Sequence, residues 1–166
     1  TIDSGSLSVS QLEGNSGTTA YNFTVNLSNP SAQDVVIHYS TQDGTATAAS
    51  GDYQGVTDGQ LTILAGQTSG TITVLVNGDV TFEPNETFFL NLTSVDNGTL
   101  GSSDVQATGT IVNDDTAPVA TIDTGSLTIS QPEGNSGTTA YNFTVNLSNP
   151  SAQDVVVHYS TQDGTA

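Results

Sequence analysis

Carboxylates are the side chains through which this sequence is best equipped to do chemistry. The 166 residues include 17 Asp and Glu, 2 His and no Lys or Arg. Glu83 and Glu86 invite a glycosidase interpretation, because paired carboxylates can act as acid and base. A carboxylate cluster without Lys, Arg or aromatic platforms is more typical of a metal site. No nucleophile–base pair, phosphate loop or cofactor fingerprint accompanies it, so we expect no enzyme.

The charge balance excludes several partners. Nucleic acids and anionic membrane surfaces are recognised through basic side chains, which this chain lacks. No apolar run is long enough to predict a transmembrane span, and no signal peptide is seen in this chain. The absence of Cys excludes disulfides. Together with the absence of Met and Trp, it suits an extracellular or cell-surface location.

The acidic residues lie between short segments in which apolar and polar residues alternate. This alternation predicts seven strands, around residues 7–9, 21–27, 35–40, 61–63, 72–76, 88–92 and 105–111. Turn signals such as Asn29-Pro30, Ala65-Gly66 and Asn97-Gly98 separate them. Seven short strands at this spacing predict an all-β, Ig-like Greek-key sandwich.

Strand parity sorts the acids between the two ends of such a sandwich. If the strands run alternately up and down, Asp34, Asp96 and Asp104 fall at one end. The other end receives nine acids, and a skew of nine against three predicts a functional pole. The nine are Glu13, Asp43, Asp52, Asp58, Asp79, Glu83, Glu86, Asp114 and Asp115.

Crowded carboxylates raise one another's pKa, and a hard divalent cation relieves the conflict. Calcium takes six to eight oxygens in irregular geometry, whereas magnesium demands a tighter octahedron and zinc prefers His or Cys. The pole offers neither His nor Cys, so Ca²⁺ is the expected ion. Solubility or a halophilic habit are the alternative explanations of the charge.

The sequence also repeats itself. Residues 1–46 recur at 121–166 with five differences, of which Leu12/Pro132 is the one that is not conservative. We expect one complete repeat at 1–118 and a partial second copy at 119–166 that holds the first three strands. The near-identity also predicts that strands of the second copy can replace their counterparts in another molecule.

Several stretches of the first repeat resemble the Calx-beta family. They are Glu13-Gly14-Asn15-Ser16-Gly17-Thr18-Thr19, Tyr39-Ser40-Thr41-Gln42-Asp43-Gly44-Thr45-Ala46, Gly51-Asp52-Tyr53, Glu83-Pro84-Asn85-Glu86-Thr87-Phe88 and Gly109-Thr110-Ile111-Val112-Asn113-Asp114-Asp115. The second copy matches as far as Asp163-Gly164-Thr165-Ala166.

The resemblance implies calcium sites at one pole of the sandwich. Asp52 is left as a turn residue fixed by Tyr53, and Asp58 as a solvated side chain. Single acids stand where calcium-rich members carry runs, so we expect fewer ions or binding at about 10⁻⁴–10⁻³ M. The implied ligands are Glu13, Asp43, Asp79, Glu83, Glu86, Asp114 and Asp115.

The histidines and the glycosylation sequons give less information about function. His38 and His158 are expected to be surface residues. Sequons occur at Asn22, Asn26, Asn85, Asn91, Asn97, Asn142 and Asn146, and chance is the simpler origin in a chain rich in Asn and Thr.

The expected function is that of a calcium-stiffened structural or adhesion repeat. Its partners would be neighbouring repeats or copies of itself, in a filament or cell coat, and cell-surface glycans. Calcium would order the exit segment Thr116-Ala117-Pro118-Val119. The alternatives are a calcium sensor in a transporter or receptor and a carbohydrate-binding module.

Overall fold

The computed structural model describes residues 1–165 and divides into two units. The first contains Thr1–Asp79 and Pro84–Asp114, and the second contains Val80–Glu83 and Asp115–Ala166. Ala166, the last residue of the second motif copy, lies outside the described residues. Strands dominate the first unit, the second contains only two short strands among its described residues, and the two helical segments are single 3-10 turns. No helix among the described residues has the length and apolarity needed to cross a bilayer.

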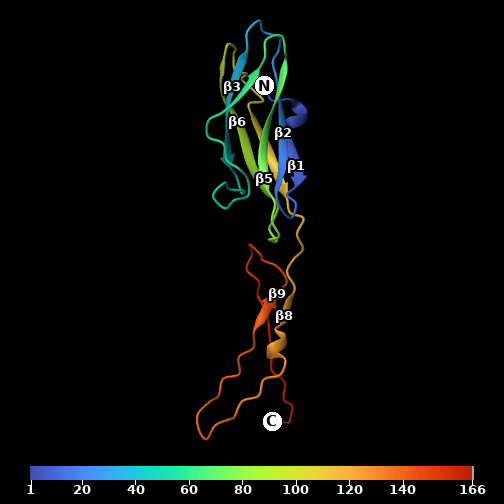
Figure 1. The fold of residues 1–166 in the computed structure, drawn as a ribbon, viewed down its shortest axis with the longest axis vertical. Coiled ribbons are helices and arrows are strands. Elements are labelled where there is room, and N and C mark those ends of the chain that lie inside the picture. Colours follow the sequence, from blue (N-terminus) through green and yellow to red (C-terminus); the bar gives the residue numbers. More distant parts are fainter. Residues whose placement is uncertain (166) are drawn as a thin grey trace. The chain divides into compact units, whose positions relative to one another are not determined.

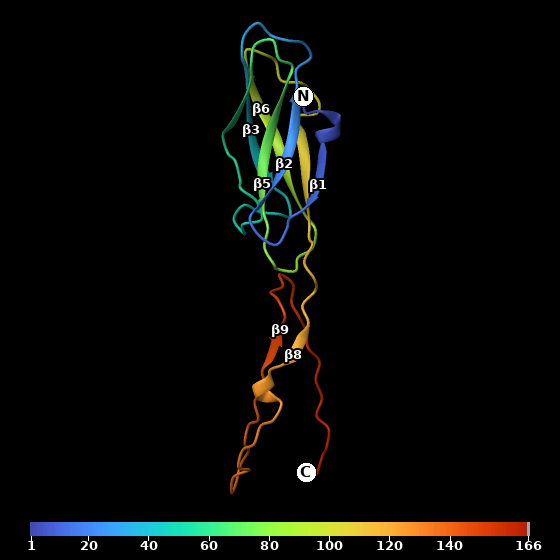
Figure 2. The same ribbon diagram turned by 45° about the vertical axis from the view of Figure 1, so that its right-hand side comes forward.

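The first unit is a sandwich of two sheets, as the alternation predicted (Figure 1). The five-stranded sheet has the order β1-β7-β6-β3-β4, and β2 pairs with β5 in the second sheet. The strands are β1 (Ser8–Leu12), β2 (Thr18–Asn26), β3 (Val35–Asp43), β4 (Gly59–Ile63), β5 (Ser69–Asn77), β6 (Glu86–Asp96) and β7 (Gln106–Val112). All seven overlap predicted segments, and the turned view in Figure 2 shows β1, β2, β3, β5 and β6 running along the unit.

Strand directions follow the predicted parity. β3 is antiparallel to β4 and β6, β6 is antiparallel to β7, and β2 is antiparallel to β5. β1 is parallel to β7, as two odd-numbered strands must be, with Leu12 opposite Val112. The carboxyl ends of β1, β3, β5 and β7 therefore share one end of the unit with the start of β6.

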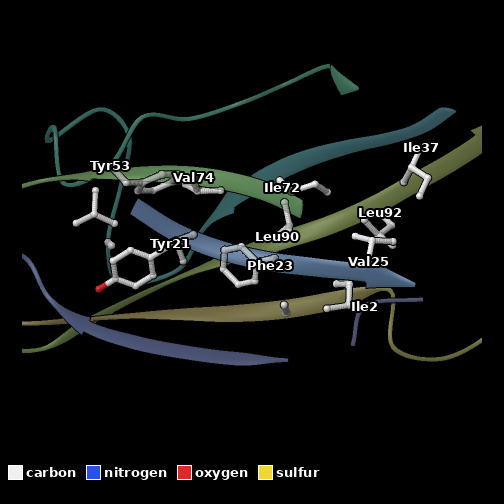
Figure 3. Close-up of a cluster of buried hydrophobic side chains, with 14 of the residues drawn as sticks. Ile2, Tyr21, Phe23, Val25, Ile37, Tyr53, Ile72, Val74, Leu90 and Leu92 are labelled. Carbon is white, nitrogen blue, oxygen red and sulfur yellow. The ribbon is translucent and has the colours of Figure 1, made fainter. Parts of the chain in front are cut away.

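Inward-facing residues of both sheets form one core, because successive side chains of a strand point to opposite faces (Figure 3). Phe88 is the centre of its aromatic part. Its ring centroid lies 5.6 Å from that of Tyr21, 6.3 Å from Phe23 and 4.7 Å from Tyr53, which stacks on it. The core thus extends to the end of the unit where the acids gather.

The N-terminal segment changes sheets before it becomes β1. Ile2 bridges to Val25 of β2, a 3-10 turn at Ser4–Ser6 follows, and the chain then joins β7. Asp3 caps the turn by accepting a hydrogen bond from the Gly5 N–H at 2.9 Å.

The second unit repeats this local motif without the rest of the sandwich. β8 (Ala120–Ile122) pairs with β9 (Val145–Leu147), so Ile122 meets Val145 as Ile2 meets Val25. A 3-10 turn at Thr124–Ser126 is again capped, here by Asp123.

The full set of three strands expected in the second copy does not form. Residues 128–132 and 155–163, which match β1 and β3, contain no strand. Their counterparts in the first unit depend on β4 to β7 for hydrogen bonds and for an apolar face. Tyr141 and Phe143 are accordingly 44% and 60% exposed, whereas Tyr21 and Phe23 are fully buried.

Candidate metal centre

Six acids of the first unit lie at the end where β1, β3, β5 and β7 finish; we name this end the acidic pole. Register brings the strand ends together, since Asp43 is opposite Phe88 and Glu86 is opposite Ile111. The six are Glu13, Asp43, Asp52, Asp79, Glu86 and Asp114.

Three of these carboxylates continue the inward-facing rows of the core. Glu86 precedes the buried Phe88 by two residues, so both belong to the same side of β6. Asp43 likewise continues the row of Val35 and Ile37 on β3. Glu13 follows β1 and is only 5% exposed, which is rare for a carboxylate. At this end of the unit, carboxylate side chains therefore follow directly after the hydrophobic core.

Asp43 is anchored to the core through Tyr53. Asp43 Oδ1 accepts hydrogen bonds from the Tyr53 hydroxyl at 2.5 Å and the Ala48 N–H at 3.0 Å. These two donors, the hydroxyl first, lower the pKa of Asp43 below its ordinary 3.8. Burial and the Asp43 bond raise the pKa of Tyr53 to about 12. Because the Tyr53 ring stacks on Phe88, the bond fixes the exposed carboxylate to the centre of the core.

Asp52 is held by the loop between β3 and β4. Its Oδ2 accepts hydrogen bonds from the Thr47 N–H and the Ser50 hydroxyl, both at 2.7 Å. Its backbone oxygen accepts the Asn77 N–H at 2.9 Å, and Tyr53 forms a bridge to Val76. The loop is therefore fastened along the end of β5, which directs Asp52 toward the start of β6.

Asp52, Glu83 and Glu86 form the one group of three potential metal ligands found among residues 1–165. One carboxylate oxygen from each lies within 4.8 Å of the others, and all three residues are half-buried. Glu83 is three residues before Glu86 in the short segment that enters β6. Two ligands of one calcium ion, each 2.3–2.6 Å from it, can be up to about 5 Å apart, so the spacing suits such an ion.

The loop between β1 and β2 closes the other side of the acidic pole. Asp114 Oδ1 accepts a hydrogen bond from the Gly14 N–H at 3.2 Å, beside the buried Glu13. Gly78, at the end of β5, donates to the Gly17 oxygen at 3.1 Å. A Cβ at Gly78 would overlap the Gly14 carbonyl, so this approach requires glycine.

The structure brings together part of the predicted ligand set. Glu83 and Glu86 join the close group, and Asp114 lies beside Glu13, but Asp43 and Asp79 are exposed and outside that group. Asp115 begins the segment 115–165 of the second unit, so its relation to the pole is not described.

Two predictions about the long loop between β3 and β4 have different outcomes. The sequence predicts Asp52 as a turn residue, but Asp52 is also a member of the close group. A single sequence does not reveal this membership, because the return of the loop to β5 is a tertiary contact. Asp58 is exposed, as expected, and it is not at the pole: its neighbour Gly59 pairs with Tyr39, four residues before the end of β3.

His38 lies away from these acids. Its Nε2 is 3.1 Å from Asp96 Oδ2, and its side chain is 22% exposed. His158 is exposed. Neither contributes to the carboxylate group, so the close group is an all-oxygen set.

Comparison with known proteins gives the same architecture. The model of the Calx-beta domain matches residues 3–116 and 119–166. The structure of the calcium binding domain CBD12 of CALX1.1 is similar at TM-score 0.60 and 24% identity, covering 74% of this chain and 48% of that chain. The apo-form Calx CBD1 domain is similar at TM-score 0.57 and 26% identity, covering 66% of this chain and 92% of that one.

One relative of established identity is much longer. The adhesion G-protein coupled receptor V1 of Danio rerio is 46% identical over 59 residues, which are 36% of this chain and 1% of the receptor. The chain spans about one hundredth of that relative's length and about half of the CBD12 chain. The match of the family model over nearly all residues and the agreement in fold show that the chain belongs to the Calx-beta domain family.

Proposed function

We propose that the acidic pole binds Ca²⁺ and that the chain is a calcium-stiffened structural or adhesion repeat rather than an enzyme. The observation that carries the proposal is the half-buried group of Asp52, Glu83 and Glu86, with ligand atoms within 4.8 Å. The chain has no Lys or Arg to neutralise these charges. The structures called calcium binding domain CBD12 of CALX1.1 and Calx CBD1 support the choice of ion.

Different structural elements position the ligands of the close group. Asp52 is set by a loop fastened to β5, and Glu86 by the register of β6 with β7. A shared cation joins these elements, so its binding stabilises their folded arrangement by mass action. Glu13, Asp43 and Asp114 lie at the same pole and supply further oxygens for a second ion or for the outer ligands of the first.

The adhesion receptor relative favours an extracellular or cell-surface setting, and the internal repeat favours a tandem array. Calcium beside Asp114 would order the segment that leads into the next copy. A regulatory calcium sensor is the second candidate, favoured by the similarity to the CALX domains. The sensor predicts a change of shape at micromolar calcium, whereas the structural repeat predicts stiffening at about 10⁻⁴–10⁻³ M.

Thermal unfolding with and without calcium tests the proposal. At about 2 mM Ca²⁺ and a Kd of about 10⁻⁴–10⁻³ M, one site adds about 0.6–1.8 kcal/mol to the free energy of unfolding. For a unit of this size the Tm then rises by about 2–7 °C over its value in EDTA.

A matched pair of variants locates the site. Glu86→Gln removes one charge from the close group, while Asp58→Asn removes one from an exposed position. We expect Glu86→Gln to abolish most of the calcium-dependent rise in Tm and Asp58→Asn to leave it unchanged. An equal rise in both variants, or no rise in the unsubstituted chain, would show that the close group does not bind calcium.

A further inference from the structure

The turn after β9 in the second unit is occupied by two other segments of the chain. Ser148 donates its N–H to the Val119 oxygen at 3.0 Å, and the Val119 N–H donates to Ser148 Oγ at 2.9 Å. Asn149 Nδ2 donates to the Thr116 oxygen at 3.0 Å. The segment Thr116–Ala120, which we name the linker, is thus hydrogen-bonded along this turn.

A second segment lies against the same turn within that unit. Phe82 donates its N–H to the Pro150 oxygen at 3.0 Å and accepts the Ala152 N–H at 3.1 Å, forming a parallel bridge with Ser151. Phe82 belongs to Val80–Glu83, which we name the loop tip. The turn therefore receives the linker on one side and the loop tip on the other through backbone groups.

The first unit contains the same turn with an identical sequence. Residues 27–33 and 147–153 both read Leu-Ser-Asn-Pro-Ser-Ala-Gln. We name residues 27–32 the docking turn.

The internal bonds of the docking turn match those of its copy. The Ser28 hydroxyl donates to Asn29 Oδ1 at 2.9 Å, as Ser148 does to Asn149 at 2.7 Å. Asn29 Nδ2 donates to the Pro30 oxygen at 3.2 Å, the same distance as in the second unit. The shape that receives the linker is therefore preformed.

The complete sandwich leaves the relevant atoms of the docking turn available. In the first unit Gly66 donates its N–H to the Ser31 oxygen at 2.8 Å. The loop tip in the second unit uses other atoms, the oxygen of the preceding Pro and the N–H of the following Ala. Occupation by Gly66 and occupation by a loop tip are therefore compatible.

A hollow adjoins the docking turn of the first unit. It has a volume of about 580 Å³, and its lining includes Thr1, Leu27, Ser28, Asn29 and Ser31. It lies at the end of the unit remote from the acidic pole, because β2 finishes there. The linker meets Leu147, Ser148 and Asn149 in the second unit, so the matching residues of the first unit open onto this hollow.

We propose that the docking turn and its hollow form an interface between repeats, and that its partner is the linker and loop tip of another unit with this sequence. The second unit shows the partner's chemistry: backbone carbonyls and N–H groups, the uncharged residues Thr116–Ala120, and the Phe82 backbone. The docking turn shares no residue with the proposed calcium site and lies at the other end of its unit, whereas the loop tip that it would receive includes Glu83 of the close group. The interface predicts head-to-tail stacking that depends little on salt, since the contacts in the second unit are made by backbone groups and by the uncharged side chains of Ser148 and Asn149.

Amide hydrogen exchange in the full chain tests the contacts on which the proposal rests. We expect the amides of Phe82, Ser148 and Ala152 to exchange about tenfold or more slowly than unstructured peptide. Asn149→Ala should speed exchange at Ser148 and Val119 several-fold. The matched variant Asn29→Ala should leave both amides unchanged. Exchange at unstructured rates in the unsubstituted chain would overturn the proposal.

A tandem chain tests the docking turn of the first unit directly. When residues 1–120 precede the full 166-residue sequence, the internal copies of Ser28 and Ala32 face a linker and a loop tip. We expect their amides to exchange about tenfold more slowly than in the single chain, with or without added salt. Unchanged rates in the tandem chain, with both units folded by circular dichroism, would refute the proposal.

Discussion

Phe23 and Phe143 are the same residue in two nearly identical copies, and the structure predicts opposite results when each is replaced by Ala. Phe23 is fully buried on β2 and its ring lies 6.3 Å from that of Phe88 in an edge-on arrangement. Phe143 is 60% exposed. The residues flanking both positions are identical, so a difference can arise only from what the rest of the fold places around them.

The size of the difference follows from burial. Phe23→Ala removes a core ring and leaves a cavity, which typically costs about 3–5 kcal/mol. At roughly 4 °C per kcal/mol for a unit of this size, the Tm falls by about 12–20 °C. Phe143→Ala removes a largely solvated ring, so its effect on the main transition should stay within about 2 °C.

Thermal unfolding followed by near-ultraviolet circular dichroism measures both variants, because the core aromatic cluster gives the signal. If Phe23→Ala does not fold, Phe23→Leu keeps the comparison at a smaller cost of about 1 kcal/mol. Equal losses of Tm from Phe23→Ala and Phe143→Ala would contradict this prediction, since they would mean that the second copy replaces the first in the sandwich. That strand exchange stays a prediction of the repeat.

Three further predictions concern the acidic pole. Tyr53→Phe removes the hydroxyl that is hydrogen-bonded to Asp43 and should lower the free energy of unfolding by about 1–3 kcal/mol in denaturant titrations. The pKa of the Asp43 carboxyl, measured by NMR, should move up toward its ordinary value. An unchanged pKa would contradict the assigned cause. Gly78→Ala should cost about 1–3 kcal/mol and weaken calcium binding in calorimetry, because its Cβ overlaps the Gly14 carbonyl, whereas Gly66→Ala, in an open turn, should leave calcium binding intact. Since the pKa of Asp43 is lowered on folding, its contribution to stability is present above about pH 4 and is lost as the pH falls through the lowered value. The difference in Tm between the unsubstituted chain and Asp43→Asn should therefore shrink between about pH 5 and pH 2. A constant difference would show that the carboxylate does not titrate as described.

Much of the first unit could be predicted from the sequence because its strands are half-buried. A period of two, as in Tyr21, Phe23 and Val25, identifies both a strand and its inward face. Strand parity then assigned Glu13, Glu86 and Asp114 to one end without any knowledge of pairing partners. Parity failed for Asp58 because a long loop can return beside a strand before the next one begins.

The membership of the close group depended on contacts that no local pattern encodes. Asp52 belongs to the close group because its loop is hydrogen-bonded to the end of β5. Asp43 is not a member of that group, and its carboxylate is hydrogen-bonded to Tyr53 instead. Both facts depend on hydrogen bonds between segments far apart in the chain. Spacing in the sequence therefore indicated a metal pole, whereas the individual ligands required the fold.

The repeated segment shows which features follow from the local sequence and which depend on tertiary contacts. The all-β class, the direction of the strands and the acidic pole could be predicted from the sequence, because alternation and chain reversal are local features. The tertiary contacts determine whether that segment forms strands: residues 18–26 are a nine-residue strand against β5, while only the last two of the identical residues 138–146 lie in a strand, at the start of β9. A strand obtains its hydrogen bonds and its buried face from neighbours, so the same residues adopt it only where those neighbours are present.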